Sequence, residues 1–480
     1  MTLNLLPVLP EVVVLTAASL ILLIDLFIGD DRRHVTYWLT QLALLLAACV
    51  TFKTMQLESV KAFHNMIVDD MLADFLRIAT IAAVSLMLFY SRSYLVARGL
   101  FRGETFVLVL FALLGMQVMI SGNNFLTLYL GLELHSLSLY ALVALQRDQA
   151  RATEAAMKYF VLGALASGIL LYGLSMIYGA TGSLDLDLVT RAVLSRQANP
   201  LLLTFGLVFI VSGVAFKLGA APYHMWVPDV YDGAPTAVTL LVGTAPKIAA
   251  FVLMLRLLSG ALQGMAFDWQ GMLIVLSLLS MVLGNLIAIA QSNVKRMLAY
   301  STIANMGFML LGFLAADLNG FSAAMFYTIA YVFTSLASFG MVMLLSRAGF
   351  ESDQIDDFKG LNQRSPWWAF IMLLVMFSLA GLPPTIGFYA KFSVIEAAVN
   401  AGFVWLAVVA VVTSLIGAFY YLRIVKLMYF DDPIDRSPLD TRADTRALLS
   451  ANGLLLLLLG ILPQPLMGLC VIALAQSNFL

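Results

Sequence analysis

The chain has 480 residues and a formal net charge of −1, with 61% hydrophobic residues, 11% charged residues and a mean hydropathy of +0.94. A soluble domain has about 45–50% apolar and about 25% charged residues, so this composition excludes a soluble globular protein and predicts one that crosses a membrane many times. The two cysteines, Cys49 and Cys470, lie in apolar runs; they fit no metal-ligand spacing and exclude a disulfide framework.

Fourteen segments are long and apolar enough to span a bilayer, which requires about 20 residues. The first is predicted to be a retained span and not a cleaved signal, because Glu11 precedes any Lys or Arg. Residues 464–480 are apolar but begin with "LPQP", so they are predicted to form either an interfacial segment or a short extra span. In chain order the fourteen spans are 8–29, 36–52, 72–91, 104–121, 123–145, 155–179, 200–220, 234–258, 269–291, 296–315, 320–346, 367–396, 402–428 and 446–463.

The basic residues are distributed unequally between alternate loops. Of the 27 Lys and Arg residues, 17 are counted with the odd-numbered loops, including Lys295, and 5 with the even-numbered loops, including Arg256 at the end of the eighth span; the other 5 lie inside spans. Cytoplasmic loops are enriched in Lys and Arg, so we expect the odd loops in the cytoplasm and both termini on the periplasmic side. No loop is long enough for a soluble domain, so soluble chemistry is expected from partner chains.

Two halves of the chain resemble each other. "AAMKYF" at 155–160 aligns with "AAMFYT" at 323–328, and "AFKLGAAP" at 215–222 aligns with "MFSLAGLP" at 376–383. Five spans separate the corresponding elements, and an odd separation inserts the two copies with opposite polarity. This pattern predicts an inverted repeat; the alternative is chance similarity between apolar helices.

The second aligned pair also predicts a broken helix in each half, because it matches Pro222 with Pro383. Proline removes a backbone donor, and a broken helix persists in lipid only where protein or water satisfies the freed groups. Broken helices in corresponding positions are the best sequence indication of an ion site. The alternative is a pair of structural kinks.

Four ionisable residues in predicted spans stand out: Glu133, Lys217, Lys247 and Lys391. Such residues cost about 2.5–3.5 kcal/mol at the centre of a span and are usually functional. Removal from water disfavours the charged form of a side chain, so a buried lysine beside a movable carboxylate can exchange a proton. We therefore predict a proton relay, with His224 in the broken segment as a possible member. The alternative is a static ion pair between Glu133 and Lys217.

Two other charged positions have local partners. Lys158 follows Glu154 by one helical turn, and Arg77 follows Asp74 by three residues. Both are predicted to be structural pairs.

Several motifs carry a family resemblance: "LGLELHSLSLYAL", "FKLGAAPYHMWVPDVYDGAPT", "APKIAAF", "KRMLAYSTIANMGFMLLG" and "FSLAGLPPTIGFYAKF". Over about residues 70–430 the chain resembles the antiporter-like membrane subunits of bacterial proton-translocating NADH–quinone oxidoreductase, respiratory complex I. The resemblance implies inverted repeats in the fourth to eighth and ninth to thirteenth helices. It also implies relay roles for Glu133, Lys217, Lys247 and Lys391. The short length and the opening segment are most similar to the N type of these subunits.

The resemblance implies an all-α polytopic membrane protein that conducts protons in the inner membrane. The redox reaction between NADH and quinone, with FMN and iron–sulfur clusters, is expected in partner subunits. This chain is expected to bind no cofactor or metal, and its partners are expected to be other complex I subunits and the bilayer, without nucleic acid. The alternatives are a subunit of a multi-subunit cation/proton antiporter, a complex I subunit of the M or L type, and a scaffold. The predicted regions are 1–103, 104–258, 269–428 and 429–480.

Overall fold

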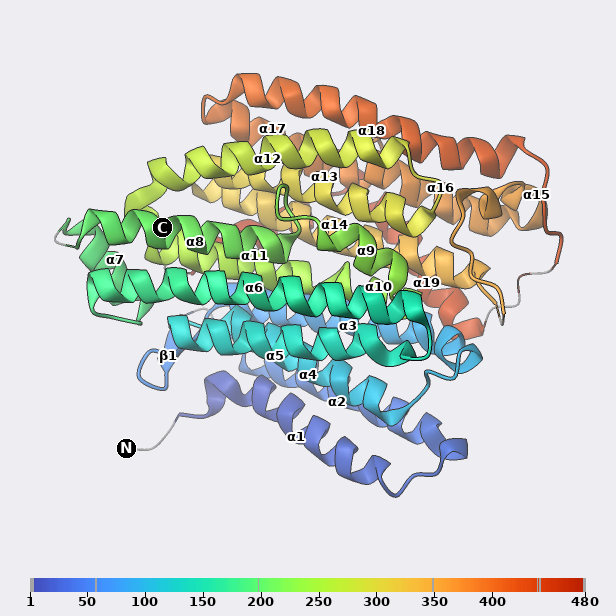
Figure 1. Ribbon diagram of the computed structural model, residues 1–480, viewed down its shortest axis with the longest axis horizontal. Helices are drawn as coiled ribbons and strands as arrows, with labels where there is room; N and C mark the ends of the chain where they lie inside the picture. Colours follow the sequence, from blue (N-terminus) through green and yellow to red (C-terminus); the bar gives the residue numbers. More distant parts are fainter. Residues whose placement is uncertain are drawn as a thin grey trace.

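The protein is a bundle of long helices that run side by side (Figure 1). The computed structural model describes residues 4–56, 58–196, 198–347, 349–437, 439 and 442–477. Within these ranges, thirteen helices are long and apolar enough to cross a membrane. The predicted class, an all-α polytopic membrane protein, is therefore confirmed.

The first half of the chain forms a row of helices and one small hairpin. The hairpin pairs β1 (Val60–Ala62) with β2 (Ile67–Asp69) in antiparallel register. The helices are α1 (Leu9–Asp25), α2 (Arg33–Thr54), α3 (Met71–Ala97), α4 (Gly103–Ser121), α5 (Phe125–Val143), α6 (Ala150–Thr181), α7 (Leu186–Leu194), α8 (Pro200–Leu218), α9 (Trp226–Gly233), α10 (Thr236–Val242) and α11 (Ala245–Leu255).

The second half contains α12 (Ala266–Ile289), α13 (Val294–Leu314), α14 (Leu318–Leu345), α15 (Leu361–Arg364), α16 (Pro366–Ala380), α17 (Ile386–Asn400), α18 (Val404–Phe430), α19 (Ala443–Ile461) and α20 (Gln464–Ala475). A π-helical turn, η4 (Arg256–Ala261), continues α11. Short 3₁₀ turns are η1 (Leu6–Val8), η2 (Asp30–Arg32), η3 (Ala144–Gln146), η5 (Gln263–Met265) and η6 (Ile355–Phe358).

Local sequence signals explain where many helices begin. The side chains of Asp70, Asn124, Asp185 and Asn293 each accept a hydrogen bond from a backbone N–H in the first turn of α3, α5, α7 and α13. Such caps satisfy donors that have no partner inside a helix. Three of these helices, α3, α5 and α13, correspond to predicted spans, and each therefore begins directly after a polar capping residue.

The twelfth predicted span is two helices, α16 and α17, separated by residues 381–385. Together with the thirteen longer helices this accounts for the fourteen predicted spans. The seventh span also breaks, because α8 ends at Leu218 and a non-helical segment leads to α9. Each helix before a break is followed by a glycine in the left-handed region, Gly219 at φ +78° and Gly381 at φ +79°.

The two breaks refine the sequence alignment by one residue. Gly219 and Gly381 are 162 residues apart, whereas the aligned segments 215–222 and 376–383 are 161 residues apart. At the structural offset, Pro222 corresponds to Pro384 and not to Pro383. The breaks in the two halves occur at matching points, and the inverted relation of the complete repeats stays a prediction.

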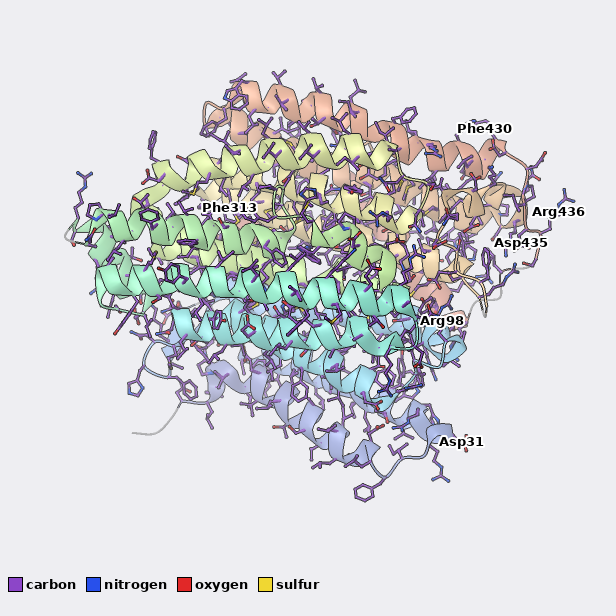
Figure 2. The ribbon with its side chains drawn as sticks, viewed as in Figure 1. Asp31, Arg98, Phe313, Phe430, Asp435 and Arg436 are labelled. Atoms are coloured by element: carbon purple, nitrogen blue, oxygen red, sulfur yellow. The ribbon has the colours of Figure 1, made fainter. Side chains whose placement is uncertain are left out.

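Charged residues of three odd-numbered loops lie at the same end of the bundle (Figure 2). Asp31, Arg98, Asp435 and Arg436 lie together at one end (Figure 2), whereas both chain termini lie toward the opposite end (Figure 1). We call these the odd-loop end and the even-loop end.

The middle of the bundle is more enclosed than its sides. The segment Thr236–Ala261 and helices α13 and α14 are almost fully buried, whereas α1, α6 and α18 expose many apolar side chains. These exposed faces suit contact with lipid or with a neighbouring membrane chain.

The C-terminal segment forms α20, which is too short to cross a bilayer. It packs against α14 and α3, and its Cys470, Ala473 and Leu474 are buried. Residues 478–480 of the predicted tail lie outside the described residues.

Candidate proton-transfer site

Lys217 lies in the last turn of α8, at the first break. Its partly buried ammonium donates hydrogen bonds to Ser136 Oγ on α5 at 2.9 Å and to Ser167 Oγ on α6 at 3.1 Å. Serines of two neighbouring helices therefore bind this ammonium.

Glu133 approaches Lys217 without an ion pair. One oxygen, Glu133 Oε1, is buried with no hydrogen-bond partner among the described residues. No hydrogen bond or ion pair of the described residues joins Glu133 to Lys217, although the carboxylate acts on the ammonium electrostatically. The static ion pair that we considered as an alternative is therefore not formed in this structure.

Lys247 lies on α11 and reaches the end of α8. It is only 1% exposed, and its Nζ donates to the carbonyl of Leu218 at 2.9 Å and to that of Lys217 at 3.4 Å. The ammonium also lies 5.4 Å from the centre of the Trp226 ring. Carbonyls at a helix C-terminus have no partner within the helix and carry partial negative charge, so this position suits a buried cation.

Lys391 lies on α17 and occupies the equivalent position in the second half. It is 8% exposed, and its Nζ donates to the carbonyl of Ala380, the last residue of α16, at 2.9 Å. A second hydrogen bond goes to Ser414 Oγ at 3.0 Å, and the Phe308 ring centre is 4.8 Å away. The sequence did not indicate Ser414, because a serine in an apolar span carries no sign of which helix it will face.

A group of polar side chains surrounds Lys391. Asn305 lies on α13, and the Tyr327 hydroxyl donates to its Oδ1 at 2.7 Å. Both residues line a small cavity beside Lys391. Further pairs among these helices are Tyr331–Thr302 at 2.7 Å, Ser301–Tyr421 at 2.5 Å and Thr334–Ser378 at 3.0 Å.

The structure brings some of the predicted relay residues together and separates others. The Lys247 ammonium donates to the backbone carbonyl of Lys217 at the end of α8, whereas no hydrogen bond of the described residues links Lys247 to Lys391. His224 is partly buried in the segment between α8 and α9, and its Nδ1 has no hydrogen-bond partner among the described residues. A role for His224 in the relay stays a prediction.

Two basic residues that we had placed in loops are buried inside the bundle. Arg256 is 0% exposed in η4, where its Nε donates to the carbonyl of Ile120 at 2.8 Å. Lys295 is 4% exposed at the start of α13, and its Nζ donates to the carbonyl of Ala234 at 2.7 Å. The loop assignment of both residues was therefore wrong, because hydropathy does not distinguish a surface charge from one that caps a neighbouring helix.

Lys295 borders a polar cavity of about 400 Å³ at the odd-loop end. Glu351 lies in the same cavity; it accepts hydrogen bonds from the Thr236 hydroxyl and, at 3.0 Å, from the Tyr94 hydroxyl, and it pairs with Arg98. Although burial opposes ionisation, the charges of Lys295 and Arg98 and the bond from Thr236 hold the pKa of Glu351 below its usual value. Polar groups are thus concentrated where the two halves meet.

The predicted local pairs are confirmed. Lys158 binds Glu154 at 2.8 Å and also Asp229 at 2.8 Å. Arg77 binds Asp74 at 3.2 Å and contacts further carboxylates described below.

Thirteen long helices, a broken twelfth crossing and a lysine at each break define a class, the antiporter-like polytopic membrane proteins. The chain belongs to the family described as NADH:quinone oxidoreductase/Mrp antiporter, whose pattern matches residues 122–417.

Individual relatives agree with this assignment. The NADH-quinone oxidoreductase subunit N of Thiobacillus denitrificans is 60% identical over 471 residues, covering 98% of each chain. A chain of respiratory complex I from Thermus thermophilus with bound aureothin is 32% identical, with a TM-score of 0.82 over 96% of this chain and 98% of that chain. A chain of the Mrp complex from Dietzia shares the fold, with a TM-score of 0.84 and 22% identity over 98% of this chain and 96% of that chain.

Proposed function

We propose that the chain is a proton-translocating membrane subunit of an NADH–quinone oxidoreductase, of the N type. Glu133, Lys217, Lys247 and Lys391 are its relay. The observation that carries this proposal is the position of Lys247 and Lys391, each buried and hydrogen-bonded to the end of a broken helix. A fixed structural lysine would gain more from a carboxylate partner, whereas these two bind neutral carbonyls.

Such a position suits repeated proton exchange. The terminal carbonyls and the aromatic ring stabilise the ammonium only in part, so small movements of the helix end change the balance between charged and neutral lysine. Glu133 provides a second influence on the balance between charged and neutral lysine, because its carboxylate acts on Lys217 without binding it. A shift of α5 toward α8 would strengthen this interaction, and a shift away would release the proton to Lys247.

Partner subunits supply the redox chemistry in this proposal. NADH oxidation and quinone reduction take place on FMN, iron–sulfur clusters and a quinone site outside this chain. By the positive-inside rule, the odd-loop end faces the cytoplasm and the termini face the periplasm. The polar cavity beside Lys295 and Glu351 then opens toward the proton-supplying side.

The test is to replace Lys217 by Met and Glu133 by Gln, separately, in the assembled enzyme. The expected result is loss of proton pumping by about tenfold or more, a typical effect of removing one proton-transfer group. NADH oxidation by a water-soluble electron acceptor is expected to continue, because this activity needs only the redox subunits.

The matched control is Lys426→Met, which removes an exposed lysine on α18. It should pump as the unmodified enzyme does. Normal pumping by both Lys217→Met and Glu133→Gln would contradict the relay, and loss of assembly in both would favour the scaffold alternative.

The shared fold with the Mrp chain favours one alternative function, a subunit of a cation/proton antiporter. Native purification separates the two. An NADH-oxidising peripheral arm that co-purifies with the chain supports the proposal, whereas small membrane subunits alone support the antiporter.

A further inference from the structure

A second cluster of buried charges lies near the even-loop end, apart from the relay. Its centre is Arg77 on α3, which is 0% exposed. Arg77 Nη2 contacts Glu11 Oε1 of α1 at 2.6 Å, and Nη1 contacts Asp69 Oδ1 of β2 at 2.6 Å and Asp74 Oδ1 at 3.2 Å. Three carboxyl groups therefore surround one guanidinium.

The cluster contains more acidic than basic groups. Asp70 and Arg256, which lie beside it at 3.4 Å from each other, add one charge of each sign. Among the described residues, four acids thus face two arginines, and each of the six is at most 6% exposed. Ser121 of α4, which also contacts the cluster, is uncharged and donates to Glu11 Oε1 at 2.9 Å. Burying carboxylates in excess of their cations is strongly unfavourable, so the cluster should take up protons.

Two buried oxygens indicate where a proton is needed. Asp74 Oδ2 and Glu11 Oε2 have no hydrogen-bond donor among the described residues. The carboxyl groups of Asp69 and Asp74 are close neighbours, because both contact the same nitrogen of Arg77. Burial raises the pKa of Asp69, although Arg77 opposes the shift. Two carboxyl groups at such a distance cannot both ionise easily, and one of them retains a proton.

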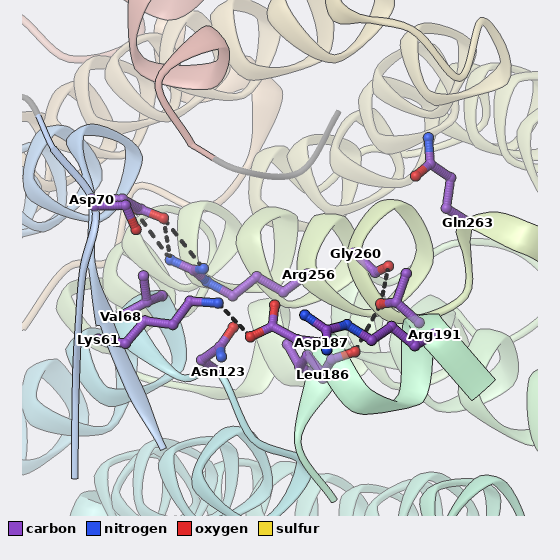
Figure 3. Close-up of a pocket in the computed structure, with 12 residues that line it drawn as sticks. Lys61, Val68, Asp70, Asn123, Leu186, Asp187, Arg191, Arg256, Gly260 and Gln263 are labelled. Carbon is purple, nitrogen blue, oxygen red and sulfur yellow. Dashed lines mark hydrogen bonds and ion pairs between the residues drawn. The ribbon is translucent and has the colours of Figure 1, made fainter. Parts of the chain in front are cut away.

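A cavity connects this region to the even-loop end of the bundle. It has a volume of about 310 Å³ and is lined by polar residues that include Asp70, Asn123 and Arg256. Figure 3 shows Asp70 facing Arg256 on one side of the cavity and Lys61 paired with Asp187 on another. Because Asp70 directly follows Asp69, the cavity brings solvent to the edge of the cluster.

We propose that Asp69 and Asp74 form a proton-binding site in which the two carboxyl groups share one exchangeable proton beside Arg77. The proton exchanges with water at the even-loop end through the cavity at Asp70. This site does not depend on the relay, and it joins α1, the β hairpin and α3. Loss of its proton places a further negative charge in the cluster and loosens these contacts.

Infrared difference spectroscopy of the assembled enzyme tests the site directly. The measurement compares the unmodified enzyme with Asp74→Asn and Asp69→Asn, and uses Asp187→Asn, at the rim of the cavity, as the matched control. The expected result is a protonated carboxyl band that disappears as the pH is raised, is missing from both cluster variants and remains in the control. The same band in all four proteins, or no band in the unmodified enzyme, would overturn the proposal.

Hydrogen–deuterium exchange of residues 60–77 in the unmodified enzyme tests the site even where a variant fails to assemble. A carboxyl group whose pKa is raised in the folded state contributes stability at low pH that is lost as the pH rises through that pKa. Protection, corrected for intrinsic exchange, should therefore fall on the alkaline side. Unchanged protection would contradict the proposal, and so would protection restored at alkaline pH by sodium ions, which would indicate a metal cation in place of the proton.

Discussion

The two broken helices use the same arrangement at their ends but differ in the charge around it. In each half a left-handed glycine follows the helix, and a lysine from a later helix donates at 2.9 Å to the last carbonyl. The first break has an additional lysine, Lys217, with Glu133 nearby. At the structural offset the second break has Leu379 in that place, and hydroxyl and amide groups surround its lysine.

This difference separates two roles. The lysine at each helix end is the common part and suits proton transfer, whereas the described residues of the second break offer no counterpart of the Glu133–Lys217 interaction. We infer that the Glu133–Lys217 interaction controls the proposed proton transfer in the first half. The lysine of the second half then responds to the first half.

The largest expected effect tests whether the two lysines are equivalent. Lys247→Met and Lys391→Met should each reduce pumping by about tenfold or more, because each removes the titratable group bound to its helix end. Lys→Arg at either site should not restore pumping, because arginine keeps its proton. Pumping is measured as acidification of vesicles. A loss confined to one half would show that the two breaks are not equivalent.

The next effect concerns the glycines at the breaks. A Cβ at Gly381 would lie 2.6 Å from Lys391 Cδ, and one at Gly219 would lie 2.7 Å from Val227 Cγ2. Left-handed backbone costs other residues about 1–2 kcal/mol. Gly381→Ala and Gly219→Ala should both lower the thermal stability of the subunit. Gly381→Ala should reduce pumping more, because its Cβ displaces the lysine itself.

The matched control for these variants is Gly168→Ala. Gly168 lies within α6, where a Cβ would meet no atom within 4 Å. Alanine favours a helix by about 1 kcal/mol relative to glycine, so stability should rise or stay unchanged. Equal losses of thermal stability in Gly219→Ala, Gly381→Ala and Gly168→Ala would show that left-handed backbone at the breaks is not the cause.

A smaller effect is expected from the hydroxyl partners. Ser414→Ala removes one of two hydrogen bonds of Lys391, and Ser136→Ala removes one of two hydrogen bonds of Lys217. A hydrogen bond to a charged group contributes about 1.5–3 kcal/mol, part of which water replaces. We expect a few-fold decrease in pumping and a shifted pH profile. The shift should be larger for Ser136→Ala, because the other partner of Lys217 is a hydroxyl and not a helix end.

The smallest effect concerns the connection between the halves. Glu351 joins Thr236, at the start of α10, to Arg98, at the end of α3. The pKa of Glu351 is lowered in the folded state. Its contribution to the stability of the folded state is therefore present at neutral pH and is lost as the pH falls through the lowered pKa. Hydrogen exchange of residues 349–357 should increase in acid, and Glu351→Gln should show the faster exchange already at neutral pH. Slow hydrogen exchange of residues 349–357 in Glu351→Gln at neutral pH would show that Glu351 does not stabilise the contact between the two halves.

Much of the fold could be predicted from the sequence. The fourteen spans, the two breaks and the family follow from hydropathy, prolines and motifs, because a bilayer imposes strong constraints on length and polarity. The sequence also identified Lys247 and Lys391 as buried, because a charge in the middle of an apolar span almost always faces the interior of the bundle and not the lipid.

The rest depended on packing between distant segments. Lys295 closely follows a run of polar residues, and Arg256 lies at the end of an apolar span. The sequence alone therefore placed both residues in loops. Ser414 resembles any other serine in an apolar helix. The contact between Glu11 and Arg77 joins residues 66 positions apart, and no local pattern indicates such a pairing.

The glycine that follows each broken helix has a mechanical consequence. Lys247 and Lys391 each donate to the last carbonyl of a broken helix, so bending at Gly219 or Gly381 changes the distance from that carbonyl to the ammonium. In the proposed relay, a displacement transmitted along the membrane would therefore move a proton without any ligand reaching the lysine.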